Sequence, residues 1–161
     1  MRGTLHSHNK FPEQFLPQLR ALWNDNYPIS LFLPTIKDLS DYLDRLINPT
    51  HYTIEEDGKL LAWHAIFDRN DERWFIMIIH QSYQRKGLGR SLLENSKKVE
   101  NQLAGWVIES DEYIKHDNSR YISPLNFYLK NNFDVDKTFR LQKNGIETVK
   151  VFWRKPFGPI V

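Results

Sequence analysis

The chain has 161 residues, with 22 Lys and Arg against 20 Asp and Glu, and it contains no cysteine. Its apolar fraction of 40% and aromatic fraction of 14% predict a folded protein, and its length predicts one domain over residues 1–161. A net charge of +2 is too small to indicate nucleic-acid binding, and no apolar run is long enough to span a bilayer. Zero cysteines exclude disulfides, thiolate zinc sites and a cysteine nucleophile. No apolar signal region follows Met1, so we expect a cytoplasmic protein.

Two helices are predicted in the first third of the chain. An apolar face over residues 15–23 predicts the first, and Pro17 places a start or a bend within it. Thr35 and Asp38 have the spacing of a capping box and begin the second helix. Asn48-Pro49 is expected to end that helix, because the residue before a proline avoids the helical region.

The hydrophobic period then changes to that of strands. Strands are predicted at residues 51–56, 59–68 and 74–79, and Asp57-Gly58 between the first two is typical of a tight hairpin. A helix is expected to open within residues 84–89, with Leu88, Leu92, Val99 and Leu103 on its buried side.

The last third of the chain adds a strand, a helix and a hairpin. The strand at residues 106–109 lies beyond a helical crossover and is therefore expected to run parallel to the strand at 74–79. Ser123-Pro124 resembles a helix start, and Asn144-Gly145 joins two strands at 137–142 and 147–154. The order ααβββαβαββ predicts an α/β fold of the α+β type, with helices packed on a mixed sheet.

The segment Gln84–Gly89 carries the strongest functional signal. Gly87 and Gly89 stand between a strand and a helix, where glycine permits a tight turn and close approach of a ligand to the backbone. The first turn of a helix presents unpaired N–H groups and a partial positive charge, which suit a diphosphate. The basic neighbours of the turn are Arg85, Lys86 and Arg90.

Two well-known phosphate loops do not fit this spacing. A P-loop needs an earlier glycine, and none lies between Gly58 and Gly87. A dinucleotide fingerprint needs a third glycine or alanine at the position that Leu92 occupies.

Gln84-x-x-Gly87-x-Gly89 resembles the acyl-CoA signature of the GNAT N-acetyltransferase superfamily, written Arg/Gln-x-x-Gly-x-Gly/Ala. The segment from Phe127 to Phe133 is similar to the family's Phe/Leu-Tyr-x-x-x-Gly-Phe motif, with Asn132 in place of the glycine. The resemblance implies the GNAT fold over nearly the whole chain. That fold is a mixed, mostly antiparallel sheet of six to seven strands flanked by about four helices, with strands four and five splayed apart.

The resemblance also implies the reaction. GNAT enzymes transfer an acetyl group from acetyl-CoA directly to a primary amine, without a metal or a covalent enzyme intermediate. The pantetheine arm lies between the splayed strands in this family. Carried over to this sequence, the resemblance implies that CoA is held by Ile79, Gln84, Arg85, Lys86, Gly87, Leu88, Gly89 and Arg90.

The resemblance suggests two catalytic residues. Tyr128 matches the family's frequent acid for the leaving thiolate, and a phenol with a pKa of about 10 holds its proton at neutral pH. Glu109 corresponds to a strand-five glutamate of relatives that acetylate protein N-termini, and burial would raise its pKa so that it could act as the base. His64, His80 and an ordered water are the alternative bases. Tyr121 stands where many relatives carry an asparagine that contacts pantetheine.

Other interpretations stay open at this point. A CoA-binding regulatory module would keep the fold without the chemistry, and a nucleic-acid-binding domain would use the basic side chains and lose affinity steeply with salt. The segment 111–122 is longer than usual for the family and forms either a substrate lip or a solvated loop. The favoured function is an N-acetyltransferase acting on an amine of a small molecule or peptide. Its expected partners are acetyl-CoA and the acceptor, without nucleic acid or membrane, in a monomer or homodimer.

Overall fold

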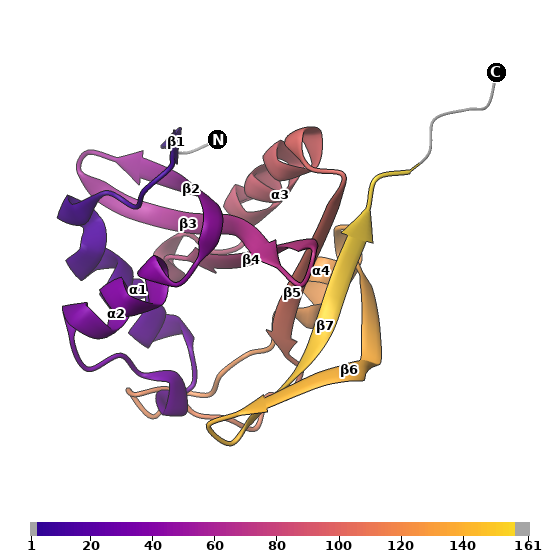
Figure 1. The fold of residues 1–161 in the computed structure, drawn as a ribbon. Coiled ribbons are helices and arrows are strands. Elements are labelled where there is room, and N and C mark those ends of the chain that lie inside the picture. Colours follow the sequence, from indigo (N-terminus) through magenta and orange to yellow (C-terminus); the bar gives the residue numbers. More distant parts are fainter. Residues whose placement is uncertain (1–2, 157–161) are drawn as a thin grey trace.

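The computed structural model describes residues 3–156, which form one seven-stranded sheet with helices on both faces (Figure 1). The strands are β1 Thr4–His8, β2 Ile47–Glu56, β3 Lys59–Arg69, β4 Glu72–Ile79, β5 Gln102–Ile108, β6 Asp134–Lys143 and β7 Ile146–Arg154. The α-helices are α1 Leu16–Asn26, α2 Ile36–Asp44, α3 Leu88–Val99 and α4 Leu125–Lys130. Short 3-10 turns are η1 Glu13–Phe15, η2 Ile29–Leu31 and η3 Gln81–Tyr83.

The order of strands across the sheet is β1-β2-β3-β4-β5-β7-β6, which confirms the predicted mixed sheet of the α+β type. The predicted element order lacks β1, because the sequence Thr-Leu-His-Ser-His holds a single aliphatic residue and gives no strand pattern. None of the helices within residues 3–156 combines the length and the hydropathy that a bilayer-spanning helix requires.

β4 and β5 are the neighbours that run parallel, and they pair at one position, Trp74 opposite Ala104. By contrast, β3 and β4 match over eight positions and β5 and β7 over seven. β4 and β5 therefore separate toward Ile79, and their divergence is visible in Figure 1. This geometry confirms the predicted splay of the two central strands.

Two apolar cores cover the two faces of the sheet. Leu88 and Leu92 of α3 and Tyr128 of α4 pack on one face with Phe75 of β4. The helices α1 and α2 cover the opposite face, where their apolar side chains pack with Trp74 and Ile78 of the same strand. Adjacent β4 residues thus belong to different cores, as the alternation of strand side chains requires.

The predicted helix cap and hairpin turns are present. Thr35 Oγ1 accepts a hydrogen bond from Asp38 N at 3.1 Å, and Asp38 Oδ2 accepts one from Thr35 N at 3.0 Å, which confirms the capping box of α2. Both residues of Asp57-Gly58 have positive φ, 52° and 76°, and Asn144-Gly145 has 52° and 75°. Asn132, with φ 68°, takes the left-handed conformation that glycine would supply after α4.

The prediction that Asn48-Pro49 ends the second helix is wrong. α2 ends at Asp44, and both residues lie inside β2, where pairing with β3 is shifted between Ile47 and Thr50. Asn48 has φ 49°, so the strand is irregular here, and such irregularities accommodate proline within sheets.

The boundary between α3 and β5 also differs from the prediction. Val99, expected on the buried side of α3, is 63% exposed, whereas Leu103 is buried but belongs to β5. Leu103 falls at helical spacing from Leu92 by coincidence, which extended the predicted helix too far. β5 begins at Gln102 and ends at Ile108, so Glu109 lies just beyond the strand on which it was predicted.

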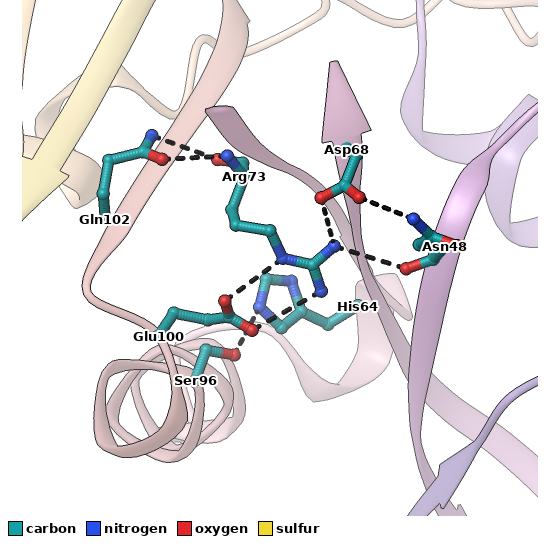
Figure 2. A network of polar contacts seen from close by, with 7 residues as sticks. All are labelled: Asn48, His64, Asp68, Arg73, Ser96, Glu100 and Gln102. Atoms are coloured by element: carbon teal, nitrogen blue, oxygen red, sulfur yellow. Dashed lines mark hydrogen bonds and ion pairs between the residues drawn. The ribbon is translucent and has the colours of Figure 1, made fainter. Parts of the chain in front are cut away.

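A polar network holds the end at which β4 and β5 stay together (Figure 2). Gln102 Oε1 accepts a hydrogen bond from Arg73 N at 2.8 Å, and Gln102 Nε2 donates to Arg73 O at 3.1 Å. The Arg73 guanidinium donates to Glu100 at 3.1 Å and to Asp68 at 2.8 Å. One arginine therefore joins β3, β4 and the connection from α3 to β5.

His64 is a core residue of β3 behind this network (Figure 2). Its Nδ1 donates to the carbonyl of Ile76 at 3.2 Å, and its Nε2 lies 2.8 Å from Ser96 Oγ. Burial lowers the pKa of His64 from 6.5 to about 4, so the imidazole is neutral at neutral pH.

Acidification is expected to destabilise the protein through His64. The unfolded chain binds a proton near pH 6.5 whereas the folded imidazole resists protonation until about pH 4, so the free energy of unfolding falls between these values. At about pH 4.5 the loss from this residue is about 2–3 kcal/mol. Urea unfolding near pH 7 and near pH 4.5 measures it, and His64→Gln should lose less stability with acid. The exposed His6 provides the control His6→Gln, and equal acid sensitivity in all three proteins would contradict the assignment.

Candidate active site

A large cavity lies where β4 and β5 diverge. It has a volume of about 1140 Å³ and is lined by every β4 residue from Phe75 to Ile79 and by residues 106–108 of β5. Because successive strand residues face opposite sides of a sheet, a cavity lined by all of them opens on both faces. One mouth lies at the turn before α3, and the other lies among α1, α2 and the β3–β4 hairpin.

The turn before α3 leaves the helix N-terminus without a side-chain cap. Gly87 is the N-cap residue with φ 85°, and the helical hydrogen bonds begin with Ser91 N donating to Gly87 O at 3.0 Å. A Cβ built on Gly87 meets no atom of residues 3–156 within 4 Å. The space beside the first turn of α3 is therefore open, and its first amides lack the side-chain cap that Thr35 gives to α2.

Gly89 serves packing rather than backbone conformation. A Cβ at Gly89 would lie 2.9 Å from the Phe127 ring of α4, which is too close for any larger residue. Glycine at this position lets α4 pack directly against the first turn of α3. The two segments that carry the sequence motifs are therefore in contact.

Gln84 ties the turn to α1 and to β4. Its Nε2 lies 2.8 Å from Asn26 Oδ1 and 3.1 Å from Ile79 O. Gln81 adds a third link, because its Nε2 donates to Asp25 O at 2.6 Å. These contacts fix the glycine turn relative to the end of α1, across the cavity mouth.

The residues predicted to hold CoA lie close together, and all except Leu88 and Lys86 line the cavity. Those that line the cavity are Ile79, Gln84, Arg85, Gly87, Gly89 and Arg90. Leu88 instead points into the core and is 1% exposed, and Lys86 Nζ lies over the Tyr83 ring, 5.6 Å from its centroid. Arg85 and Arg90 make the charge of this mouth positive.

The backbone of Ile79 faces the gap between the strands. His80 N donates to Leu61 O of β3 at 2.8 Å. Because successive amides of a strand point to opposite sides, the N–H of Ile79 points away from β3. The bond from Gln84 to Ile79 O agrees with that orientation. The Ile79 N–H points the same way, toward β5.

Tyr128 lines the cavity from α4. Its ring is buried against Phe75 and Phe127, with centroid distances of 5.5 Å and 5.2 Å. Burial, and to a smaller extent Tyr121, raises the pKa of Tyr128 above its ordinary value. The phenol therefore holds its proton at neutral pH and can donate it.

The structure does not bring Glu109 into the cavity. Within residues 3–156, the residues that line the cavity do not include it. Its Oε2 lies 3.1 Å from Lys137 Nζ without hydrogen-bond geometry, and its Oε1 lies 3.8 Å from Arg140 Nη1. These contacts give the carboxylate a role in holding β6.

The two candidate histidines are also outside the cavity lining of residues 3–156. His64 is enclosed in the core, as described above. His80 Nδ1 accepts a hydrogen bond from Ser82 N at 3.1 Å and so caps the turn η3. Burial and the nearby charge of Lys59 lower the pKa of His80.

The segment between β5 and α4 folds back over the end of α1. Ile29 N donates to Ile114 O at 2.8 Å, and His116 Nε2 lies 2.9 Å from Asp25 Oδ1. Residues 121–124 line the cavity, and burial raises the pKa of Tyr121. Most of residues 111–120 are exposed, so the structure supports the lip for the end of the segment and the solvated loop for the rest.

The sequence analysis did not bring together the residues that form the second mouth. They belong to no local motif: Trp23 and Asn26 of α1, Tyr27 after it, Asp38, Asp41 and Tyr42 of α2, Arg45 after it, and Phe67 and Arg69 of β3. They come together only when β3 pairs with β4 and the helices α1 and α2 pack on the sheet.

Comparison with solved structures shows the same fold. An acyl-CoA N-acyltransferase from Pseudomonas aeruginosa is 16% identical, with a TM-score of 0.63 over 92% of this chain and 96% of that chain. The ribosomal-protein-S18-alanine N-acetyltransferase from Escherichia coli is 15% identical, with a TM-score of 0.62 over 97% of both chains. An aminoglycoside 6′-N-acetyltransferase complexed with coenzyme A is 11% identical, with a TM-score of 0.64 over 98% and 99%. At these identities the likeness is one of fold.

The sequence itself carries the family assignment. No curated protein matches the chain. Residues 48–135, more than half of the chain, match the family model described as an acetyltransferase (GNAT) domain. This range includes β4, the glycine turn, α3, β5 and α4, the elements that build the first mouth of the cavity. The chain belongs to the GNAT acetyltransferase family.

Proposed function

We propose that the protein is an acetyl-CoA-dependent N-acetyltransferase that transfers acetyl directly to a primary amine of a small molecule or peptide. The observation that carries this proposal is the uncapped N-terminus of α3, which opens on a cavity running through the sheet between β4 and β5. A carrier bound at the turn can extend its arm into the gap, and an acceptor can enter from the opposite face. The family supports the same reaction class.

The residues around the turn fit the diphosphate of CoA. Open space above Gly87, free first-turn amides and the partial positive charge of the helix provide an anion cradle. Arg85 and Arg90 add positive charge at the cavity wall, although Arg90 also pairs with Glu94 at 3.0 Å. The residues proposed to hold CoA are Ile79, Gln84, Arg85, Lys86, Gly87, Leu88, Gly89 and Arg90, with Leu88 contributing its backbone.

Acetyl-CoA supplies an acetyl group activated as a thioester. The Ile79 N–H, which faces the gap, is the proposed donor to the negative charge that develops on the carbonyl oxygen during acyl transfer. Tyr128 is the proposed acid, because its raised pKa keeps the phenol protonated beside the cavity.

The acceptor amine must lose a proton to attack. Glu109 stays a sequence-based prediction for this base, but its ion pairs lie outside the cavity lining. His64 and His80 are held by hydrogen bonds within the fold. We infer that water in the open cavity takes the proton, since water needs only a path to solvent, which both mouths provide.

Replacing Gly87 by glutamate is expected to abolish acetyl-CoA binding. The new side chain and its negative charge would enter the open space where the diphosphate is proposed to lie. Calorimetric titration with acetyl-CoA measures the loss. Gly58→Glu is the matched control, because Gly58 also has positive φ, 76°, and open space around its Cβ. If Gly87→Glu binds as tightly as the control, CoA lies elsewhere.

Tyr128→Phe is expected to lower kcat by about a hundredfold with little change in acetyl-CoA affinity, because the thiolate would leave without an acid. Thiol release in the presence of a panel of amines measures turnover. Tyr52→Phe, at a buried tyrosine of β2, is the control and should keep wild-type turnover. Tight CoA binding with no wild-type turnover on any amine would indicate a regulatory CoA-binding module instead.

Glu109→Gln is expected to leave the pH profile of kcat/KM unchanged, because the carboxylate pairs with Lys137 and Arg140 rather than facing the cavity. Measuring kcat/KM for one amine across the neutral pH range checks this. Loss of one ionisation from the profile would show that the sequence-based assignment of the base was right.

A further inference from the structure

The second mouth of the cavity holds two arginines and a tyrosine. Arg45, Arg69 and Tyr42 all line the cavity on the face covered by α1 and α2. Burial raises the pKa of Tyr42 to about 12, so the phenol keeps its proton at neutral pH. Two cations and a hydroxyl donor thus line this mouth of the cavity.

Arg69 is held in place by aromatic rings. Its guanidinium carbon lies 5.1 Å from the ring centroids of both Phe67 and Trp74. These two residues face each other across β3 and β4, so the guanidinium rests on a paired aromatic surface. A guanidinium stacked in this way is oriented before a ligand arrives, which reduces the entropy lost on binding.

The carboxylates of this mouth have other partners. Asp38 Oδ2 accepts hydrogen bonds from Thr35 N and Thr35 Oγ1, at 3.0 Å and 2.7 Å. Asp41 Oδ2 accepts one from Lys37 Nζ at 2.7 Å. In the part of the chain spanning residues 3–156, no carboxylate lies within 4.0 Å of either Arg45 or Arg69.

We propose that Arg69 and Arg45, with Tyr42, bind an oxyanion of the acceptor, so that the acceptor is an amine that also carries a carboxylate or a similar group. This inference rests on the proposed acetyl transfer. A planar guanidinium donates two parallel hydrogen bonds to a carboxylate, which suits this chemistry better than a neutral group. The subsite selects the acceptor and does not take part in the chemical step.

The distance along β4 sets the length of the acceptor. Arg69 lies over Trp74, at the closed end of the strand pair, whereas the proposed reaction centre is near Ile78 and Ile79. Trp74 and Ile78 are four residues apart on one face, about 13 Å at 3.3 Å per residue. After allowing for the reach of the side chain, the amine and the oxyanion should be about 10 Å apart, which is the length of about three extended peptide residues.

Glycine oligomers measure both requirements. With acetyl-CoA present, kcat/KM is determined for glycine, diglycine, triglycine and tetraglycine, and for triglycinamide, which has the same length without the carboxylate. We expect kcat/KM to rise with length up to triglycine or tetraglycine, and triglycine to exceed triglycinamide by about tenfold or more. Equal values for triglycine and triglycinamide, or a preference for glycine, would overturn the proposal.

Arginine variants localise the effect. Arg69→Gln should reduce the ratio of kcat/KM for triglycine to kcat/KM for triglycinamide to near one. Arg45→Gln should reduce the ratio in part. Arg154→Gln, at an exposed arginine outside the cavity lining, should keep the wild-type ratio. An unchanged ratio in Arg69→Gln would overturn the assignment to this subsite.

A binding measurement separates this inference from the proposed function. If the protein transfers acetyl to amines without regard to the carboxylate, the acceptor subsite is wrong and the acetyltransferase proposal stands. If no amine is acetylated, triglycine is titrated into the CoA-loaded protein by calorimetry. Binding that Arg69→Gln abolishes would support the oxyanion subsite alone, and no binding would overturn it.

Discussion

The candidate site depends on a single pairing position between two parallel strands. β4 and β5 meet at Trp74 and Ala104 and separate beyond it. Separated strands leave backbone N–H and C=O groups without sheet partners, which costs free energy. Strong contacts where the strands stay together are needed to offset that cost. Gln102 does this by bonding both backbone groups of Arg73, and the Arg73 guanidinium extends the joint to Glu100 and Asp68 (Figure 2). The cavity is therefore a consequence of how its far end is closed.

The starts of α2 and α3 differ in how their first backbone amides are satisfied. α2 satisfies its first amides with the reciprocal bonds of Thr35 and Asp38. α3 begins at Gly87 with no such side chain and with its basic neighbours close by. An uncapped helix start is less stable by about 1 kcal/mol than a capped one. α1 and α4 also begin without a side-chain cap, so α3 is distinguished by the open space at Gly87 and by its basic neighbours.

The sequence predicted those features that depend on neighbouring residues. Asp57-Gly58, the Thr35 cap and the glycine turn follow from backbone preferences of a few residues, and all are present. Features that depend on distant partners were missed or misplaced. Asn48-Pro49 lies in a strand because β3 pairs with Ile47 and Thr50 on either side of it, and the end of β5 at Ile108 decides where Glu109 points. Neither fact is encoded locally.

The contrast between local and distant determinants also explains why the family motif identifies the CoA site more readily than the acceptor site. The proposed CoA residues lie within one short stretch, 79–90, where spacing alone fixes their relation to the helix start. The second mouth combines α1, α2 and the β3–β4 hairpin, and its residues meet only after β3 and β4 pair and α2 packs on them. Two arginines lie at each mouth, Arg85 and Arg90 at one and Arg45 and Arg69 at the other, and the second mouth also carries Asp38 and Asp41. A carrier with a diphosphate and an acceptor with an oxyanion would thus each be held at the end remote from the reacting atoms, with the neutral, apolar middle of the cavity left for acyl transfer.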